Sequence, residues 1–168
     1  MRCCGVVIAA GATAVSCAGA PLHKDPVASA AAAEEAHCSK GLADEPRLFA
    51  PDLVTGVSPV MRSYRMGKAE REVLAGVELA IPAQPGLTSE WITRNLICHQ
   101  AQHLLGHAGE SQDAYWLPGT WLEFGVHSRG DLFLVDIYAA DPASADAILT
   151  RTRAFVAHRG AAPGAAAL

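Results

Sequence analysis

The chain has 168 residues, and 51% of them are hydrophobic, which suits a single domain with one buried core and extensions. Its formal net charge is −4, and the sequence shows no basic stripe. Nucleic acid is therefore not an expected partner, because such binding depends on Lys and Arg side chains that neutralise phosphates.

The N-terminus has the pattern of an export signal. Arg2 supplies a positive charge, and residues 3–15 form a charge-free apolar run that is short for a bilayer span. The run ends in the sequence AVSC at Cys17, which resembles the lipobox of bacterial lipoproteins, with Ala14 where Leu is usual. We predict a lipoprotein-type signal peptide over residues 1–16, lipidation at Cys17, and a membrane-anchored protein that faces the periplasm or the cell exterior. A plain signal peptide is the alternative.

Two cysteines remain outside the signal and the lipidation site, Cys38 and Cys98. An exported protein lies in an oxidising compartment, where an even pair of cysteines indicates a disulfide. The alternative is a buried free thiol at Cys98.

The segments that flank the regular part of the sequence carry weak patterns. Residues 17–46 are rich in Ala and Pro and have few large apolar side chains, which predicts a disordered linker with a transient helix over 28–36. Residues 47–75 predict an irregular covering segment, with an extended stretch near Val57 and either a helix or a turn over 68–74. The Gly, Ala and Pro of residues 159–168 predict a disordered tail.

Residues 76–158 carry a regular pattern and form the predicted domain. Alternating apolar residues over 76–81 indicate a strand. Thr88 or Ser89 can cap a helix that runs to about residue 105 and stops at Gly106.

The second half of this domain predicts a hairpin and a helix. Strands are expected over 121–127 and 132–138, with a tight turn at Arg129-Gly130-Asp131, where an integrin-type motif is far less expected than simple turn chemistry. Asp141 caps a final helix that Pro142 opens. The resulting β-α-β-β-α order predicts a two-layer α+β sandwich, ferredoxin-like but without its last strand. The segment before residue 76 either supplies that strand or covers the edge.

Three histidines stand four residues apart on the first predicted helix: His99, His103 and His107. This spacing places them on one side of a helix, where a pair of imidazoles can chelate Zn²⁺ or Cu²⁺. A closed site needs a further ligand, for which His37 or Glu110 is the candidate.

The helical wheel turns the histidines, with Ile92 and Leu96 among them, away from the sheet and turns Cys98 and Ala101 toward the core. The alternatives to a metal site are a solvated polar face, or packing of Ile92 and Leu96 under the N-terminal segment. No Glu follows His103, so the HExxH pattern of zinc proteases is absent.

The outer face of the predicted sheet is a second candidate site, for a ligand or a protein partner. Aromatic, acidic and imidazole side chains alternate there on neighbouring strands: Trp121, Glu123, His127, Asp136 and Tyr138. We expect residues 47–75 to cover this face, because exposed Trp and Leu favour a lid, and an open ligand or partner surface is the alternative.

One part of the chain resembles a known family. The sequence PGLTSEW at residues 85–91, followed by a helix with Cys98 and His99, resembles an uncharacterised family of exported bacterial proteins, many of them lipoprotein-like. The similarity covers roughly residues 70–157. Cys98, His99 and His107 match its pattern, whereas His103 is particular to this chain. The resemblance implies location and fold and carries no activity.

No spacing groups Ser, His and Asp as nucleophilic catalysis requires, so an enzyme is not expected. We expect a non-enzymatic binding or interaction module of the cell envelope, anchored in the membrane and able to contact another envelope protein. The alternative is a metal-binding or metal-sensing envelope protein that uses the three histidines.

Overall fold

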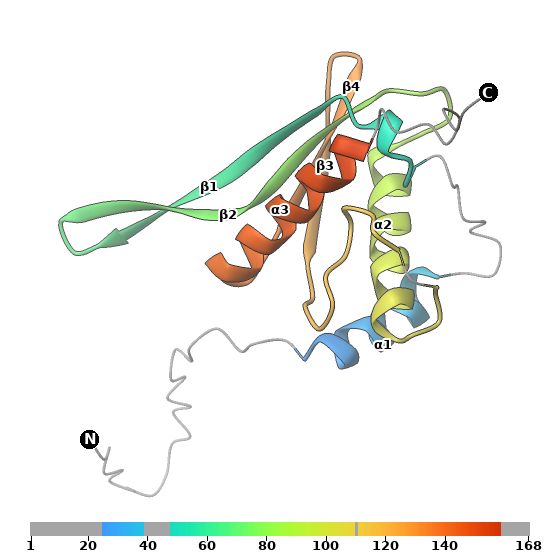
Figure 1. Ribbon diagram of the computed structural model, residues 1–168, viewed down its shortest axis with the longest axis horizontal. Helices are drawn as coiled ribbons and strands as arrows, with labels where there is room; N and C mark the ends of the chain where they lie inside the picture. The colour runs from blue at the N-terminus through green and yellow to red at the C-terminus, as the bar shows by residue number, and fades with distance from the viewer. Residues whose placement is uncertain (1–24, 39–47, 110, 159–168) are drawn as a thin grey trace, which may run out of the picture.

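The computed structural model describes residues 25–38, 48–109 and 111–158 (Figure 1). The predicted signal peptide, Cys17, Glu110 and the C-terminal tail lie outside these residues. The elements in chain order are α1 (Pro26–His37), the short 3₁₀ helix η1 (Pro51–Leu53), β1 (Gly56–Met66), β2 (Ala69–Pro82), α2 (Ser89–Leu104), β3 (Glu123–Arg129), β4 (Leu132–Tyr138) and α3 (Pro142–Ala157). Within the described residues, no helix has both the length and the apolar character needed to cross a membrane.

The strands form one antiparallel sheet in the order β1-β2-β4-β3. The chain leaves β2, passes through α2 and enters β3, and β4 then lies between these two strands. This is the split βαβ arrangement of ferredoxin-like folds. The predicted α+β sandwich is confirmed. The fourth strand comes from β1, so the segment before residue 76 completes the sheet rather than covering it.

The core lies between one face of the sheet and helices α2 and α3. Every second residue of β2 and β4 points into it, as the alternation predicted. The fully or almost fully buried members from these strands and helices are Val77, Leu79, Ile81, Phe133, Val135, Ile137, Ile92, Leu96, Ile148, Leu149 and Phe155. Both helices begin at the expected caps, because Thr88 Oγ1 accepts the Trp91 N–H and Asp141 Oδ1 accepts the Ala143 N–H.

The assignment of the α2 faces from the helical wheel is wrong. Ile92 and Leu96, placed there on the histidine side, are fully buried against the sheet. Cys98 and Ala101, assigned to the core, face α1 instead. The wheel assumed a single buried face, whereas α2 lies between the sheet and another helix.

The prediction of a disordered linker is wrong for residues 26–37, which form α1. Asp25 caps this helix by accepting the Val27 N–H at 2.9 Å. Ala30 and Ala33 are buried against Ala101 of α2. The segment carries little apolar surface of its own, and small side chains let the two helices approach closely, so α2 supplies the burial that isolated α1 lacks.

A disulfide ties the C-terminal end of α1 to α2. Cys38 and Cys98 are bonded, with their Cα atoms 5.2 Å apart and a separation of 60 positions in sequence. This geometry agrees with the predicted pair and not with a free thiol at Cys98.

The prediction of an irregular covering segment is wrong for most of residues 47–75. Beyond η1, this segment forms β1 and the first part of β2, paired from Gly56↔Ala80 to Met66↔Ala69. The expected helix or turn over 68–74 is strand from Ala69 onward, and the reversal uses Gly67 with φ 65°. Both faces of this hairpin carry polar residues, so no apolar alternation marked it in the sequence.

We expect reduction of the Cys38–Cys98 disulfide to lower the free energy of unfolding by about 4 kcal/mol, because the bond closes a long loop in the unfolded chain. Urea unfolding followed by circular dichroism, with and without a phosphine reductant, measures the change. A Cys38→Ser/Cys98→Ser variant is the control and should not respond to reductant. An unchanged wild-type transition would show that the bond does not form.

Candidate functional site

Two of the three predicted histidines form a cluster with an aspartate from a loop. His99 and His103 project from α2, and Asp113 comes from the loop between α2 and β3. Each residue offers one ligand atom, and these atoms lie within 4.8 Å of one another. Two imidazoles and a carboxylate are ligands that divalent transition metals prefer.

Asp113 is the best-connected member of the cluster. His99 Nε2 lies 2.9 Å from Asp113 Oδ2, and the Ser111 hydroxyl donates to the same oxygen. Asp113 Oδ1 accepts the Tyr115 N–H at 2.8 Å. Burial acts to raise the pKa of the Asp113 carboxyl, but the hydrogen bond and charge of His99 and the bonds from Ser111 and Tyr115 outweigh burial. The pKa therefore lies below its ordinary value, and the carboxyl is ionised at neutral pH.

Aromatic side chains hold the two imidazoles in place. Phe49 stacks on His99 with ring centroids 3.9 Å apart, and Trp116 stacks on His103 at 4.6 Å. The two histidine rings meet edge to face at 4.5 Å. The His99 side chain is only 13% exposed. Both rings are therefore oriented by packing before any ligand arrives.

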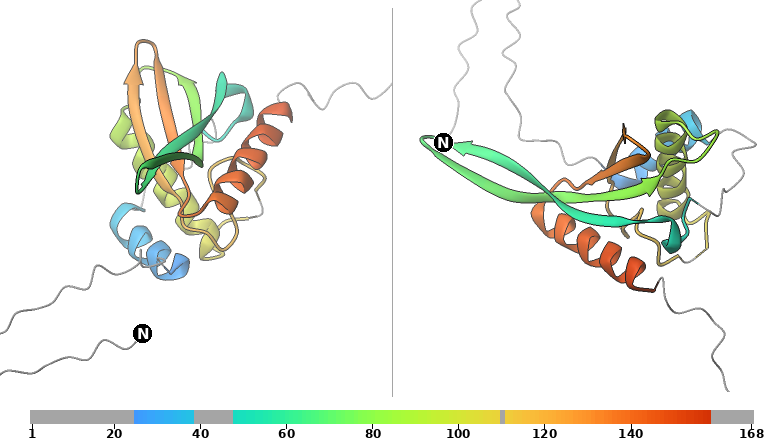
Figure 2. Two further views of the ribbon diagram at one scale, coloured as in Figure 1. Left: turned by 90° about the vertical axis from the view of Figure 1, so that its left-hand side faces the viewer. Right: turned by 90° about the horizontal axis from the view of Figure 1, so that it is seen from above.

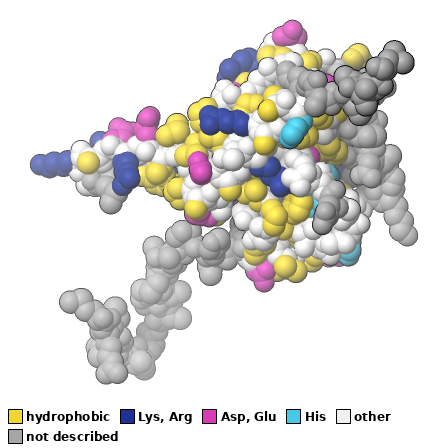
Figure 3. All heavy atoms as spheres, viewed as in Figure 1, with side chains coloured by type: hydrophobic (Ala, Val, Ile, Leu, Met, Phe, Trp, Pro, Cys, Tyr) yellow, Lys and Arg dark blue, Asp and Glu magenta, His cyan; other side chains and the backbone are white. Residues whose placement is uncertain are grey.

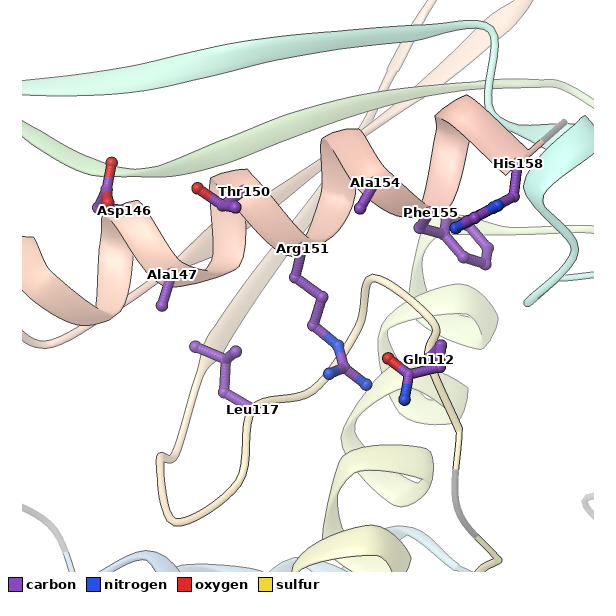
Figure 4. A pocket seen from close by; sticks show the side chains of 9 residues that line it. All are labelled: Gln112, Leu117, Asp146, Ala147, Thr150, Arg151, Ala154, Phe155 and His158. Atoms are coloured by element: carbon purple, nitrogen blue, oxygen red, sulfur yellow. The ribbon is translucent and has the colours of Figure 1, made fainter.

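Arg151 of α3 fixes the loop that carries Asp113. Its Nε donates to the Asp113 carbonyl at 2.6 Å, and its Nη2 donates to the Ser111 carbonyl at 2.5 Å. The guanidinium also lies over the Trp116 ring, 5.0 Å from the centroid. Figure 4 shows Arg151 reaching from α3 toward this loop, beside a cavity of about 660 Å³ that Gln112 also lines. Arg151 is therefore a positioning residue for the cluster.

The prediction that His107 joins the other histidines is wrong. Its Nδ1 lies 2.8 Å from Glu34 Oε1 of α1, and its side chain is 57% exposed. Docking of α1 brings Glu34 next to His107 and holds it outside the cluster. His37, a proposed fourth ligand, lines a pocket with Ser89 and Ile97 and does not belong to the cluster.

Sequence reasoning missed Asp113 because it belongs to no periodic element. The loop signal that could have found it is a Ser and an Asp two residues apart, with only Ala114 between Asp113 and the aromatic pair Tyr115 and Trp116. Such Asx turns bind their own backbone, as Asp113 does with Tyr115. The order of contacts also argues against nucleophilic catalysis, because Ser111 donates to Asp113, whereas a triad serine must bond to the histidine.

The outer face of the sheet gathers four of the five side chains predicted there. Glu123 and His127 come from β3, and Asp136 and Tyr138 from β4. His127 Nδ1 lies 3.6 Å from Asp136 Oδ2. Trp121 is the exception, since it precedes β3 and packs against the buried alanines between α1 and α2.

The expected lid over this face is contradicted among the described residues. The segment before residue 76 extends the sheet, and the His127 side chain stays 50% exposed. Arg62 of β1 lies over this face, with its guanidinium 5.5 Å from the Tyr138 ring centroid. This face offers single charged pairs rather than a group of converging ligand atoms.

We expect Asp136→Asn to lower the pKa of Tyr138. Burial raises the pKa of the Tyr138 hydroxyl, and the charge and hydrogen bond of Asp136 raise it further, while Arg62 lowers it. Removing the Asp136 charge makes the phenolate easier to form, so the titration should move to lower pH. Carbon NMR of labelled tyrosine measures it. Asp146→Asn on α3 removes the same charge and should leave Tyr138 unmoved. A Tyr138 titration unaffected by Asp136→Asn would contradict this interpretation.

Compared with known proteins, the chain matches no family model, no curated protein and no solved structure. The resemblance to exported bacterial proteins therefore stays a prediction.

Proposed function

We propose that this protein binds a divalent transition metal, Zn²⁺ or Cu²⁺, through His99, His103 and Asp113. The observation that carries the proposal is the convergence of three ligand atoms of the right type within 4.8 Å. In zinc sites the ligand atoms lie about 2.0–2.1 Å from the ion, and neighbouring ligand atoms about 3.3 Å apart. Small side-chain rotations bring the cluster to that spacing.

The surroundings of the cluster support this proposal. Asp113 is ionised at neutral pH and brings the negative charge that a cation needs. Phe49 and Trp116 hold the imidazoles, and Arg151 holds the loop backbone. Three protein ligands leave the coordination shell open, which suits reversible binding or transfer of an ion more than a permanent structural site.

The proposal places this metal site in the bacterial cell envelope, in a protein anchored through Cys17. The charge and apolar run of the N-terminus support export, as does a disulfide between Cys38 and Cys98, because such bonds persist in oxidising compartments.

We expect His103→Gln to weaken Zn²⁺ or Cu²⁺ binding more than about 100-fold, because even outer-shell changes cost about 10–100-fold. Isothermal titration calorimetry of the full-length chain with each metal alone measures the dissociation constant. His107→Gln is the matched control: it changes the same residue type four residues along the chain, beyond the end of α2 and outside the cluster, and should leave affinity within threefold of wild type.

Binding should also weaken at lower pH, because imidazoles must be neutral to ligate a metal. The proposal is rejected if the wild-type chain takes up no metal at micromolar concentration. It is rejected equally if His103→Gln and His107→Gln weaken binding to the same extent.

Arg151→Lys tests whether the loop must be held in place. Lysine keeps the positive charge but cannot donate two fixed hydrogen bonds to the Asp113 and Ser111 carbonyls. We expect a loss of metal affinity of about tenfold, in the range of outer-shell effects. Arg153→Lys, two residues along the same helix and exposed, should have no effect. Equal metal affinities of the two variants would show that Arg151 does not position the metal ligands.

A further inference from the structure

The hairpin of β1 and β2 extends beyond the body of the protein as an arm, defined here as residues 61–74. Figures 1 and 2 show it projecting past the N-terminal end of α3. The side chains described over residues 61–72 are all exposed. Six strand residues from Met61 to Met66 span about 20 Å. No packing in the described residues requires this length, so the arm is free to contact something else.

The two faces of the arm differ in charge. Cross-strand pairing places Arg62 opposite Val73 and Tyr64 opposite Arg71 on one face. We call these four residues the arginine face. It holds no acidic side chain.

The other face of the arm is balanced. There Arg65 is paired with Glu70, and Ser63 with Glu72. On the arginine face no carboxylate of the arm offsets Arg62 and Arg71, although Arg62, at the base of the arm, also lies over the Tyr138 ring.

The arm is basic in a chain that is acidic overall. It carries four cations, Arg62, Arg65, Lys68 and Arg71, against Glu70 and Glu72, while the chain has a net charge of −4. Figure 3 shows Lys and Arg side chains at the far end of the arm. The tip lies farther from the acidic body than the Debye length of about 8 Å at physiological salt. An anionic surface can therefore attract the tip without being repelled by the body.

The arm also exposes apolar groups. Met61 and Tyr64 are each 49% exposed, and they are two of the three large hydrophobic residues exposed in the described part of the chain. Tyr64 belongs to the arginine face, whereas Met61 is paired with Leu74 on the other face. Long cationic side chains beside tyrosine are typical of segments that lie at a membrane interface.

We propose that the arginine face of the arm binds the surface of an anionic phospholipid membrane. An exposed two-stranded ribbon with cations on long side chains suits a diffuse layer of headgroups better than a shaped protein partner. Strand pairing with a second copy is disfavoured, because Pro59 lacks an N–H and the ladder is irregular between Val60 and Met61. Each cation near such a membrane strengthens partitioning about fivefold. A lipid anchor on the same chain would make this weak contact effective.

Vesicle co-sedimentation tests the proposal. The full-length chain carries Cys17→Ser, so that no acyl chain contributes, and is mixed with phosphatidylcholine vesicles with or without 30% phosphatidylglycerol. We expect binding that requires phosphatidylglycerol and disappears in 0.5 M salt. Arg62→Gln/Arg71→Gln should weaken it about tenfold or more.

Arg94→Gln/Arg153→Gln is the matched control, because it removes the same charge from exposed helix positions of the body. It should change partitioning less than twofold. To separate the two faces of the arm, Arg71→Gln should weaken binding more than Arg65→Gln does. Thermal unfolding confirms that each variant is folded.

Three outcomes would overturn the proposal. They are equal binding to both kinds of vesicle, equal weakening by the arm and control variants, and no binding to phosphatidylglycerol vesicles. A concentration-dependent dimer in analytical ultracentrifugation that only Arg62→Gln/Arg71→Gln disrupts would identify a second copy as the occupant instead. None of these readouts depends on the metal site, so the two proposals stand or fall separately.

Discussion

The second half of α2 packs against the sheet, against α1 and against the loop that carries Asp113, and the rest of the structure depends on this constraint. None of residues 95–105 is exposed. Leu96 packs on the sheet, Ala101 packs on α1, and His99 lies under Phe49 and beside Asp113. The side chain of the fully buried Gln100 donates a hydrogen bond to the Leu122 carbonyl and accepts one from the Leu122 N–H. The helix thereby fixes where β3 begins, where α1 docks and where the histidines point.

This constraint explains what the sequence could and could not predict about the fold. Strand alternation and helix caps are local signals, so β4, α2 and α3 were predicted with nearly correct ends. The buried face of α2 was not, since one wheel cannot show that two partners cover opposite sides. Helix α1 escaped prediction for the same reason, because its alanines gain burial only from Ala101 and its neighbours.

The site, like the fold, was predictable only where its features follow from local sequence, and not where they depend on contacts between distant segments. The spacing of His99 and His103 follows from helix geometry alone. The loss of His107 to Glu34 and the gain of Asp113 depend on how α1 and the loop dock, which no periodicity encodes. The basic character of the arm was hidden likewise. Its cations are interspersed with Glu70 and Glu72 in sequence, and only cross-strand pairing sorts them onto different faces.

The two carboxylate oxygens of Asp113 make different contacts and have different roles. Oδ1 accepts the Tyr115 N–H and so holds the turn, while Oδ2 faces His99 and the Ser111 hydroxyl. An ion in the proposed site would replace the His99 contact at Oδ2 and leave the bond at Oδ1 intact. Arg151, which binds backbone carbonyls and not the carboxylate, would also keep its contacts. The loop can thus accept or release a metal without losing the bonds that shape it, which is what reversible binding requires of a buried carboxylate.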